Sequence, residues 1–429
     1  MQAMGDNSRG AATPVRPLPI GAFALPFGFL LLPAGPDTEP VRQELLAGRL
    51  PRQWPARLRG HQRALEGDLD AAVRSFTGRD PVSRFNRFVL APDAVGPDEL
   101  RAALGHPLGV LVDLVLFATG RSDTVPDPAS VDGELAALLL AGVAVQALAG
   151  APVQGTYMPN ELGDAPPAVT LLRLAVAEAG PVSCALAGVL HGALAQACQA
   201  AGDPGAAIAA LETGIALLSG TDLRTGRAEQ HLELASTYHE LALSQPARLT
   251  RAVHHYHCAL QEVSREEAPE VFAAAHAGLA AAYLTMPMAE ASDQLRLGVA
   301  VGSLRAALTV YTRERHPAQW SSAQLNLANA LVCAPSAHRA GNLAEAIELY
   351  EAVLGARSRT ADPVGYARAL ANQGNALAHL GMLDEARAKL AEARVLFEES
   401  QEWDAAASVR GLLDEIGRRK GDYAAASGP

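Results

Sequence analysis

One segment of this chain occurs twice with the same layout, 46 residues apart. HPAQWSSAQLNLANAL runs from His316 to Leu331, and DPVGYARALANQGNAL runs from Asp362 to Leu377. A segment that recurs at a fixed interval is usually one unit of a repeat architecture. The chain is therefore expected to be built, at least in this part, from similar units placed one after another.

The composition favours helices as the material of these units. Hydrophobic residues make up 49% of the 429 residues but aromatic residues only 5%, so Ala and Leu supply most of the apolar character. Ala and Leu are the strongest helix formers. There is no long run of the β-branched residues that strands prefer, so strands are not expected to dominate.

A ladder of small and large residues runs through the repeats. In the last full unit it consists of Gly374, Leu377, Gly381, Ala386, Leu390 and Ala393. Upstream copies begin at the small anchors Ala195, Ala235, Ala280 and Ala328, and the five anchors are separated by 40, 45, 48 and 46 residues. This ladder resembles the tetratricopeptide repeat (TPR), a helix–turn–helix unit of about 34 residues. The resemblance implies an all-α fold, a right-handed superhelical solenoid of TPR-like helix pairs with units longer than the family's standard.

The longer unit has further features. An aromatic residue, Phe272, Trp320 or Tyr366, opens the first helix, and NLANAL or NQGNAL follows inside it. These features resemble a long-unit bacterial subclass of the family with a Trp…Gln-x-Asn-Leu-Gly-Asn-Ala-Leu core. The resemblance extends from about Ser183 to Glu398.

The remaining segments define the expected domain organisation. Gly60, Gly67, Ala72 and Phe76 fit the ladder and mark one candidate degenerate repeat. A helix from Trp403 to Arg419 would cap the array, because the last repeat of a solenoid otherwise exposes an apolar face. We expect a disordered tail at 1–19, an irregular helical N-terminal region at 20–180, the array with its capping helix at 181–420, and a tail at 421–429.

The longest apolar run, from Ile20 to Gly35, contains two prolines and is too short to span a bilayer. It is either a buried or docked segment or, less in keeping with its flanks, an export signal. The formal net charge of −11 argues against a nucleic-acid or anionic membrane surface as partner. The four cysteines are far apart and form no CxxC, which indicates neither a disulfide framework nor a closed zinc site and favours a cytoplasmic location.

In the TPR family the first helices line a concave groove, and the residue after the small anchor points into it. By that register Gln196, Ser236, Asn329 and Asn375 would face the groove, and His239, Glu240, Leu325 and Arg368 would lie in its lining. An amide offers both a donor and an acceptor and could hold a peptide backbone. The alternative is that these side chains hydrogen-bond the neighbouring repeat, and the sequence leaves both open.

Arrays of this family that hold a C-terminal carboxylate use a clamp with basic residues. Leu325 and Ala371 occupy two of those slots here, and only Arg368 remains. This departure argues against the binding of a carboxylate tail. We expect a non-catalytic interaction module that binds a partner protein, a peptide or an apolar segment, with an apolar small molecule as a further possible ligand, in the groove. The alternative is an enzyme or small-molecule-binding protein of a specialised biosynthetic pathway, with a pocket between the N-terminal region and the groove and candidate lids at Phe27–Gly35 and Gly155–Asp164. A ligand-responsive regulator is a third hypothesis. No HExxH, P-loop, dinucleotide fingerprint or GxSxG motif occurs, so no catalytic residue or cofactor is predicted.

Two sets of histidines remain. His191, His231 and His276 each stand four residues before an anchor, which predicts a repeated packing role with a hydrogen bond across the repeat. In HHYHC, His254, His257 and Cys258 share one face of a helix. Such a trio could bind zinc or copper with a fourth ligand from elsewhere, but the prediction for this chain is no metal.

Overall fold

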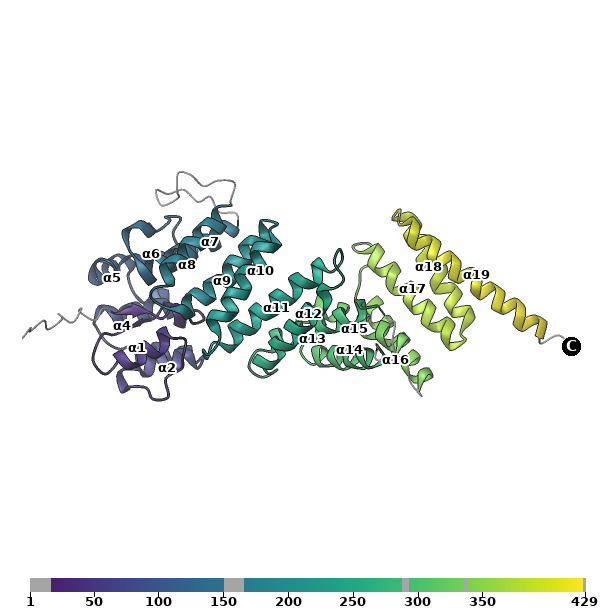
Figure 1. Cartoon of the computed structure of the whole chain (residues 1–429), viewed down its shortest axis with the longest axis horizontal. Coiled ribbons are helices and arrows are strands. Elements are labelled where there is room, and N and C mark those ends of the chain that lie inside the picture. Colours follow the sequence, from purple (N-terminus) through teal and green to yellow (C-terminus); the bar gives the residue numbers. More distant parts are fainter. Residues whose placement is uncertain (1–16, 150–165, 288–292, 335–337, 427–429) are drawn as a thin grey trace, which may run out of the picture. The chain divides into compact units, whose positions relative to one another are not determined.

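The computed structural model describes residues 17–149, 166–287, 293–334 and 338–426 (Figure 1). The chain forms two compact units that divide between Gln230 and His231. We call them the N-terminal unit and the C-terminal unit. The expected disordered tail falls largely on residues 1–16, and the expected lid at Gly155–Asp164 falls within 150–165; both lie outside the described residues.

The N-terminal unit is helical apart from one small sheet. Its elements are β1 (Leu18–Pro19), β2 (Leu31–Leu32), α1 (Glu39–Leu46), α2 (Arg59–Leu65), α3 (Leu69–Ser75), α4 (Pro81–Leu90), α5 (Pro97–Leu104), α6 (Val110–Ala118), α7 (Gly133–Leu148), α8 (Pro167–Ala179), α9 (Cys184–Ala200), α10 (Pro204–Leu218) and the start of α11 (Arg224–Leu241). Short 3₁₀ turns lie at Phe27–Phe29, Ala56–Leu58, Pro92–Ala94 and Pro128–Ser130.

The apolar run from Ile20 to Gly35 forms part of the core, with Ile20, Phe27, Leu30 and Leu31 buried. Strands β1 and β2 pair antiparallel, with Pro19 opposite Leu31. The Asn86 side chain accepts from the Leu31 N–H at 2.7 Å and donates to the Leu31 carbonyl at 2.9 Å. Because these bonds satisfy the backbone, an irregular segment can be buried. The prediction of a buried segment is confirmed.

Helices α2 and α3 form a short hairpin at the position of the candidate degenerate repeat. Gly67 makes the turn with φ of +83°, a left-handed conformation that glycine adopts readily. A methyl group on Gly60 would lie 2.8 Å from the Phe76 ring, so the glycine allows the two helices to approach. Helices α7 to α10 pack consecutively, and the expected boundary at 180/181 therefore falls inside the N-terminal unit.

The C-terminal unit consists of helix pairs in sequence order. After the rest of α11 come α12 (Arg248–Glu262), α13 (Pro269–Thr285), α14 (Asp293–Leu308), α15 (Pro317–Cys333), α16 (Arg339–Leu354), α17 (Pro363–Leu380), α18 (Leu383–Glu399) and α19 (Trp403–Ala426). The pairs α13/α14, α15/α16 and α17/α18 pack internally, and each first helix also contacts the next first helix. The prediction of an all-α fold built from TPR-like helix pairs is confirmed.

The ladder accounts for this packing. The anchors Ala235, Ala280 and Ala328 are fully buried, as are Ala252, Ala307 and Ala346 on the second helices. Gly374 takes the same place in the last pair, where an added methyl group would lie 2.8 Å from Leu390. Small residues at these crossings allow the helices of a pair to approach closely, and large ladder residues such as Tyr350 fill the space around them.

Proline and glycine residues mark several helix ends in this unit. Helices α13, α15 and α17 begin at Pro269, Pro317 and Pro363, a position where the missing N–H costs nothing. Helix α17 ends at Gly381, which has φ of +89°. The predicted capping helix is α19, which buries Ala406, Val409 and Ile416 in the core formed with α17 and α18. Within the described ranges, no helix combines the length and apolar character that a bilayer crossing requires.

Candidate functional site

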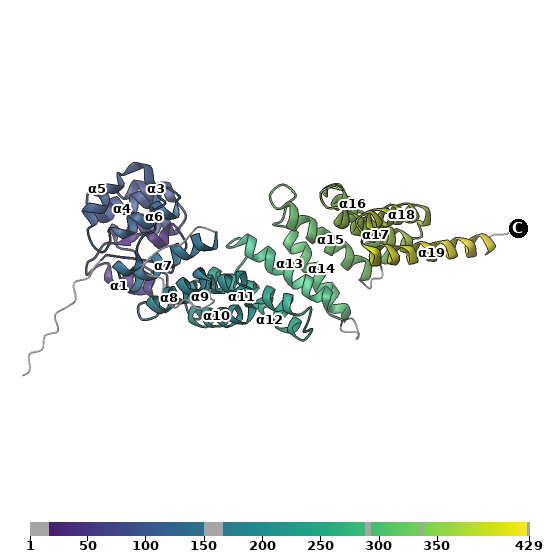
Figure 2. The ribbon, with the colours of Figure 1, turned by 90° about the horizontal axis from the view of Figure 1, so that it is seen from above.

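The first helices of the C-terminal unit lie next to one another and form a hollow. Helix α13 contacts α15, and α15 contacts α17 (Figure 2). A hollow of about 400 Å³ lies on α13 and α15, lined by Ala274, Ala277, Tyr311, Ala318, Gln319, Ser322, Ala323 and Asn326. Most of these side chains are small, so the hollow can admit an apolar side chain of another molecule.

A stripe of exposed or half-buried residues follows each first helix at spacings of three and four. It comprises Ala274, Gly278, Ala281 and Thr285 on α13, Ser322, Asn326, Asn329 and Cys333 on α15, and Arg368, Asn372, Asn375 and His379 on α17. We call these residues the first-helix stripe. Its side chains are mostly small on α13. They include two amides on α15, and two amides and two basic groups on α17. The chemical character of the stripe therefore differs between its two ends.

Asn329 is tied into the fold by its side-chain oxygen. The Tyr350 hydroxyl donates to Asn329 Oδ1 at 2.7 Å, and Asn372 Nδ2 donates to the same oxygen at 2.9 Å. The first bond joins the two helices of a pair, and the second joins that pair to the next. Within the described part of the chain the Asn329 Nδ2 group makes no hydrogen bond, so its two donors remain for a ligand.

Ser236, at the equivalent position of α11, hydrogen-bonds the ladder tyrosine of its own pair, Tyr256. Burial raises the pKa of Tyr256, and the bond with Ser236 opposes that rise. Asn375 is half-buried and makes no side-chain hydrogen bond to any described residue. Gln196 is exposed on α9 and belongs to the N-terminal unit.

The other expected lining residues differ in their surroundings. His239 lies edge-on to Tyr256 with ring centroids 6.5 Å apart, and burial lowers its pKa against the opposing effect of Glu240. Glu240 is exposed, and Leu325 is partly buried against the cores of the last two pairs. Arg368 is exposed and has no ion pair within the described residues. Of these four, Arg368 is the group best placed to meet a charged ligand.

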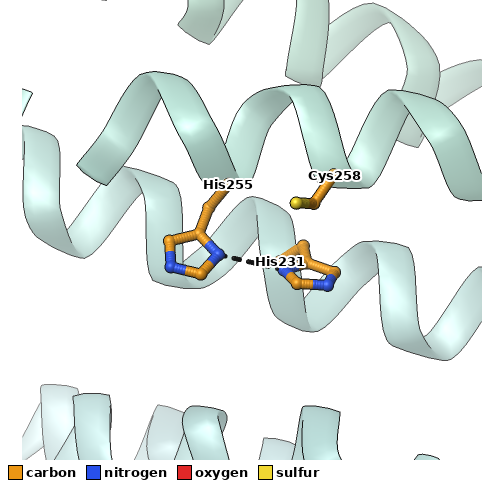
Figure 3. Close-up of side chains that lie close together, drawn as sticks. All are labelled: His231, His255 and Cys258. Carbon is orange, nitrogen blue, oxygen red and sulfur yellow. Dashed lines mark hydrogen bonds between the residues drawn. The ribbon is translucent and has the colours of Figure 1, made fainter. Parts of the chain in front are cut away.

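A second cluster of polar side chains lies between α11 and α12. His231 Nδ1 lies 3.1 Å from His255 Nδ1, and the two rings stack at an interplanar angle of 27° (Figure 3). One ligand atom each of His231, His255 and Cys258 lies within 4.8 Å of the others. All three side chains are half-buried.

The sequence pattern predicts His254, His257 and Cys258 as the candidate trio, whereas the three residues whose ligand atoms lie within 4.8 Å of one another are His231, His255 and Cys258. His254 Nε2 lies 3.6 Å from Cys258 Sγ, whereas His257 Nε2 lies 3.2 Å from the Tyr283 hydroxyl. A signal for His255 was present in the sequence. It stands three residues after Ala252 and four before Ala259, and both of these ladder residues are fully buried.

The surroundings of the cluster favour the uncharged forms of His255 and Cys258. Burial, with smaller effects of His231, His254 and Arg251, lowers the pKa of His255 to about 4. Burial also raises the pKa of the Cys258 thiol, and the negative charge of Glu262 adds to that effect. Neutral imidazoles hold the lone pairs that metal coordination requires.

The hydrogen bond predicted for the repeated histidine slot is found at one of its three positions. His231 contacts His255, as described. The Nδ1 atoms of His191 and His276 are buried and have no partner within the described residues. His276 instead packs edge-on against Phe272, with ring centroids 4.4 Å apart. The slot is thus a packing position at which the ring nitrogen is not always satisfied.

Comparison with protein-family models gives no match. No curated protein matches the chain either. Solved structures similar in fold include a putative kinesin light chain from Podosopora anserina with nearly identical TPR-like repeats. It shows 23% identity and a TM-score of 0.36, over 49% of this chain and 95% of that chain.

Two further solved structures are similar. A Rap protein complexed with Competence and Sporulation Factor shows 13% identity and a TM-score of 0.40, over 85% of this chain and 99% of that chain. The human IFIT1 dimer with PPP-AAAA shows 15% identity and a TM-score of 0.36, over 95% of this chain and 91% of that chain. These similarities concern the fold. The long-unit bacterial subclass and the cytoplasmic location stay predictions.

Proposed function

We propose that the C-terminal unit is a protein-interaction module that holds a short segment of a partner protein along the first-helix stripe. The observation that carries this proposal is the position of the apolar hollow on α13 and α15 beside unsatisfied amides and an unpaired guanidinium on α15 and α17. No catalytic role is proposed for any residue of the stripe.

The stripe defines the chemistry of the segment. A small apolar side chain would enter the hollow beside Ala274 and Ala277. Asn329 Nδ2 and the Asn375 amide would bond backbone carbonyl and N–H groups of the partner, which supply affinity without demanding a particular sequence. An acidic side chain of the partner would meet Arg368, the one guanidinium of the stripe.

The composition of the stripe also fits a nucleic acid or a small apolar molecule less well than a peptide. A nucleic-acid backbone needs several cations in a row to replace its counterions, and the stripe offers none beyond Arg368 and, when protonated, His379. A small apolar molecule would fill the hollow but would leave the amides of Asn329 and Asn375 unused. A peptide uses both features together.

The test is a selection of random peptides on the full-length protein, followed by binding measurements on a matched pair of variants. Ala274→Trp fills the hollow, whereas Ala344→Trp places the same ring on an exposed position of α16. We expect selected peptides to lose at least about tenfold in affinity for Ala274→Trp and to bind Ala344→Trp like the unchanged protein. Equal binding to both variants, or failure of the selection to yield any peptide, would overturn the proposal.

A further inference from the structure

The cluster of His231, His255 and Cys258 has a donor arrangement that the packing of the array does not require. In the α15/α16 pair the same ladder register places Gln324, Leu349 and Ala352 at the equivalent positions. Here two imidazoles and a thiol converge from two helices instead (Figure 3). A contact between two neutral imidazoles needs one shared proton, and the contact between His231 and His255 does not itself involve the thiol.

The distances agree with those between ligands of one zinc ion. With Zn–N of about 2.0–2.1 Å and Zn–S of about 2.3 Å, tetrahedral geometry places two nitrogens about 3.4 Å apart and nitrogen and sulfur about 3.6 Å apart. His231 Nδ1 and His255 Nδ1 are already 3.1 Å apart. Because Cys258 Sγ lies within 4.8 Å of one ring nitrogen of each histidine, rotation of side chains would complete the set without moving a helix.

The helices hold the three residues firmly. His255 and Cys258 are three residues apart on α12 and so project from the same side of that helix. Ala252 and Ala259, on the same side, are fully buried, which fixes the rotation of α12 about its axis. His231 stands one helical turn before the buried anchor Ala235 on α11. The site is therefore carried by rigid elements on both sides.

We propose that His231, His255 and Cys258 bind one zinc ion through Nδ1, Nδ1 and Sγ, with the fourth position open to water. Two nitrogens and one thiolate are donors that zinc favours over magnesium or calcium. The half-buried position leaves a path for the ion and for the water. This inference is independent of the proposed peptide binding.

His254 is the neighbour that could be mistaken for a ligand. Its Nε2 lies 3.6 Å from Cys258 Sγ, but it does not belong to the group whose atoms all lie within 4.8 Å of one another. The proposal therefore predicts that His254→Ala keeps its zinc. His257, which contacts Tyr283, and Cys333, which is exposed on α15, provide matched controls of the same residue types.

The experiment measures zinc bound to the reduced full-length protein after equilibration with zinc and removal of the excess. We expect one zinc per chain, and a loss of at least about tenfold in affinity in His231→Ala, His255→Ala and Cys258→Ser. His254→Ala, His257→Ala and Cys333→Ser should bind like the unchanged protein. Because Cys258→Ser alters a single atom of a half-buried side chain, it keeps the test valid if a histidine variant fails to fold.

Cobalt provides an independent readout. Replacement of zinc by Co²⁺ should give the visible bands of a tetrahedral site and a thiolate-to-cobalt charge-transfer band. That band should vanish in Cys258→Ser and persist in Cys333→Ser. Absence of stoichiometric zinc, a charge-transfer band that survives in Cys258→Ser, or loss of zinc in His254→Ala would each overturn the assignment of these three ligands.

Discussion

The Tyr350 hydroxyl donates a hydrogen bond of 2.7 Å to the side-chain oxygen of Asn329. Tyr350 is a fully buried ladder residue, and Asn329 follows the small anchor of the same helix pair. A residue expected to line the groove is thus also the acceptor for a buried hydroxyl. Asn375 has the same register position in the next helix pair. The ladder residue of that pair is Leu390, which has no hydroxyl group, and the Asn375 side chain makes no such hydrogen bond.

The two asparagines should therefore respond differently to removal of the amide. Asn329→Ala leaves the buried Tyr350 hydroxyl without its acceptor, and we expect the free energy of unfolding to fall by about 1–3 kcal/mol. Asn375→Ala removes no hydrogen bond within the described chain and should change that free energy by less than about 0.5 kcal/mol. Urea denaturation of the two variants measures the difference. A larger loss in Asn375→Ala than in Asn329→Ala would contradict the role assigned to Tyr350.

The ladder itself could be predicted from the sequence, because the interval between small residues determines which positions can lie at a helix crossing. Ala235, Ala280 and Ala328 are buried as that interval requires. The dual role of Asn329 could not be predicted from its register, since Asn375 has the same register. It depends on whether the second helix presents a tyrosine or a leucine, and on how far that side chain reaches.

The cluster between α11 and α12 shows a second limit. The helical spacing of HHYHC predicts one shared face for His254, His257 and Cys258, and it leaves His255 out of that set. His255 lies one helical turn from Ala252 and one from Ala259, so it is on the same side of α12 as these two buried residues. The contact with His231 further depends on the offset between two helices, which turn length and packing decide. In the N-terminal unit, the burial of Ile20–Gly35 could be predicted from its apolar character. The hydrogen bond between Leu31 and Asn86 could not be predicted, because the two residues lie 55 positions apart in the sequence.

Two glycines of the C-terminal unit should respond to alanine with opposite signs. At Gly278 an added methyl group would collide with the Tyr256 ring, and we expect Gly278→Ala to destabilise the fold by about 1–3 kcal/mol. Gly298, in the middle of α14, is exposed and has no atom near the position of the added group. Gly298→Ala should stabilise the fold by about 0.5–1 kcal/mol through helix propensity. Thermal denaturation of both variants checks the signs, and destabilisation by Gly298→Ala would show that α14 needs its glycine for another reason.

His61 should make the N-terminal unit depend on pH. Its Nε2 donates to the Leu31 carbonyl at 2.9 Å, while Nδ1 is buried without a partner among the described residues. Burial lowers the pKa of His61 from its ordinary 6.5 to about 4, against the opposing effect of that hydrogen bond. As the pH falls, His61 of the unfolded chain therefore becomes protonated at a higher pH than His61 of the folded chain. The stability that neutral His61 contributes is fully present above pH 6.5 and is lost as the pH falls towards 4, by about 3 kcal/mol in total.

Glu134 has the opposite effect on the pH dependence of stability, because burial raises its pKa to about 7. A variant of His61 separates the two effects. The stability associated with protonated Glu134 is present below pH 4.5 and is lost as the pH rises through 7. His61→Gln keeps a donor for Leu31 but cannot titrate. The difference in unfolding free energy between the unchanged protein and His61→Gln should shrink by about 3 kcal/mol between pH 7.5 and pH 4. Denaturation curves that keep a constant difference over this range would show that His61 does not titrate differently in the two states.

Arg368 should determine the charge preference of the bound segment. It is the exposed cation of the first-helix stripe and has no ion pair within the described residues, so its charge is available to a ligand. Peptides selected on the unchanged protein should be enriched in acidic residues near one end. Arg368→Glu replaces attraction by repulsion and should weaken their binding by on the order of tenfold, since each exposed pair contributes up to about 1 kcal/mol.

Arg368→Lys keeps the charge and serves as the matched control. It should bind the same peptides within about threefold, because an exposed pair gains little from guanidinium geometry. The difference between the Glu and Lys variants should diminish as salt rises, since ions screen exposed charges over about 10 Å at 0.1 M. A difference that persists at high salt would mean that Arg368 acts through packing rather than charge. Peptides without acidic enrichment that bind all three proteins equally would place the binding surface away from α17.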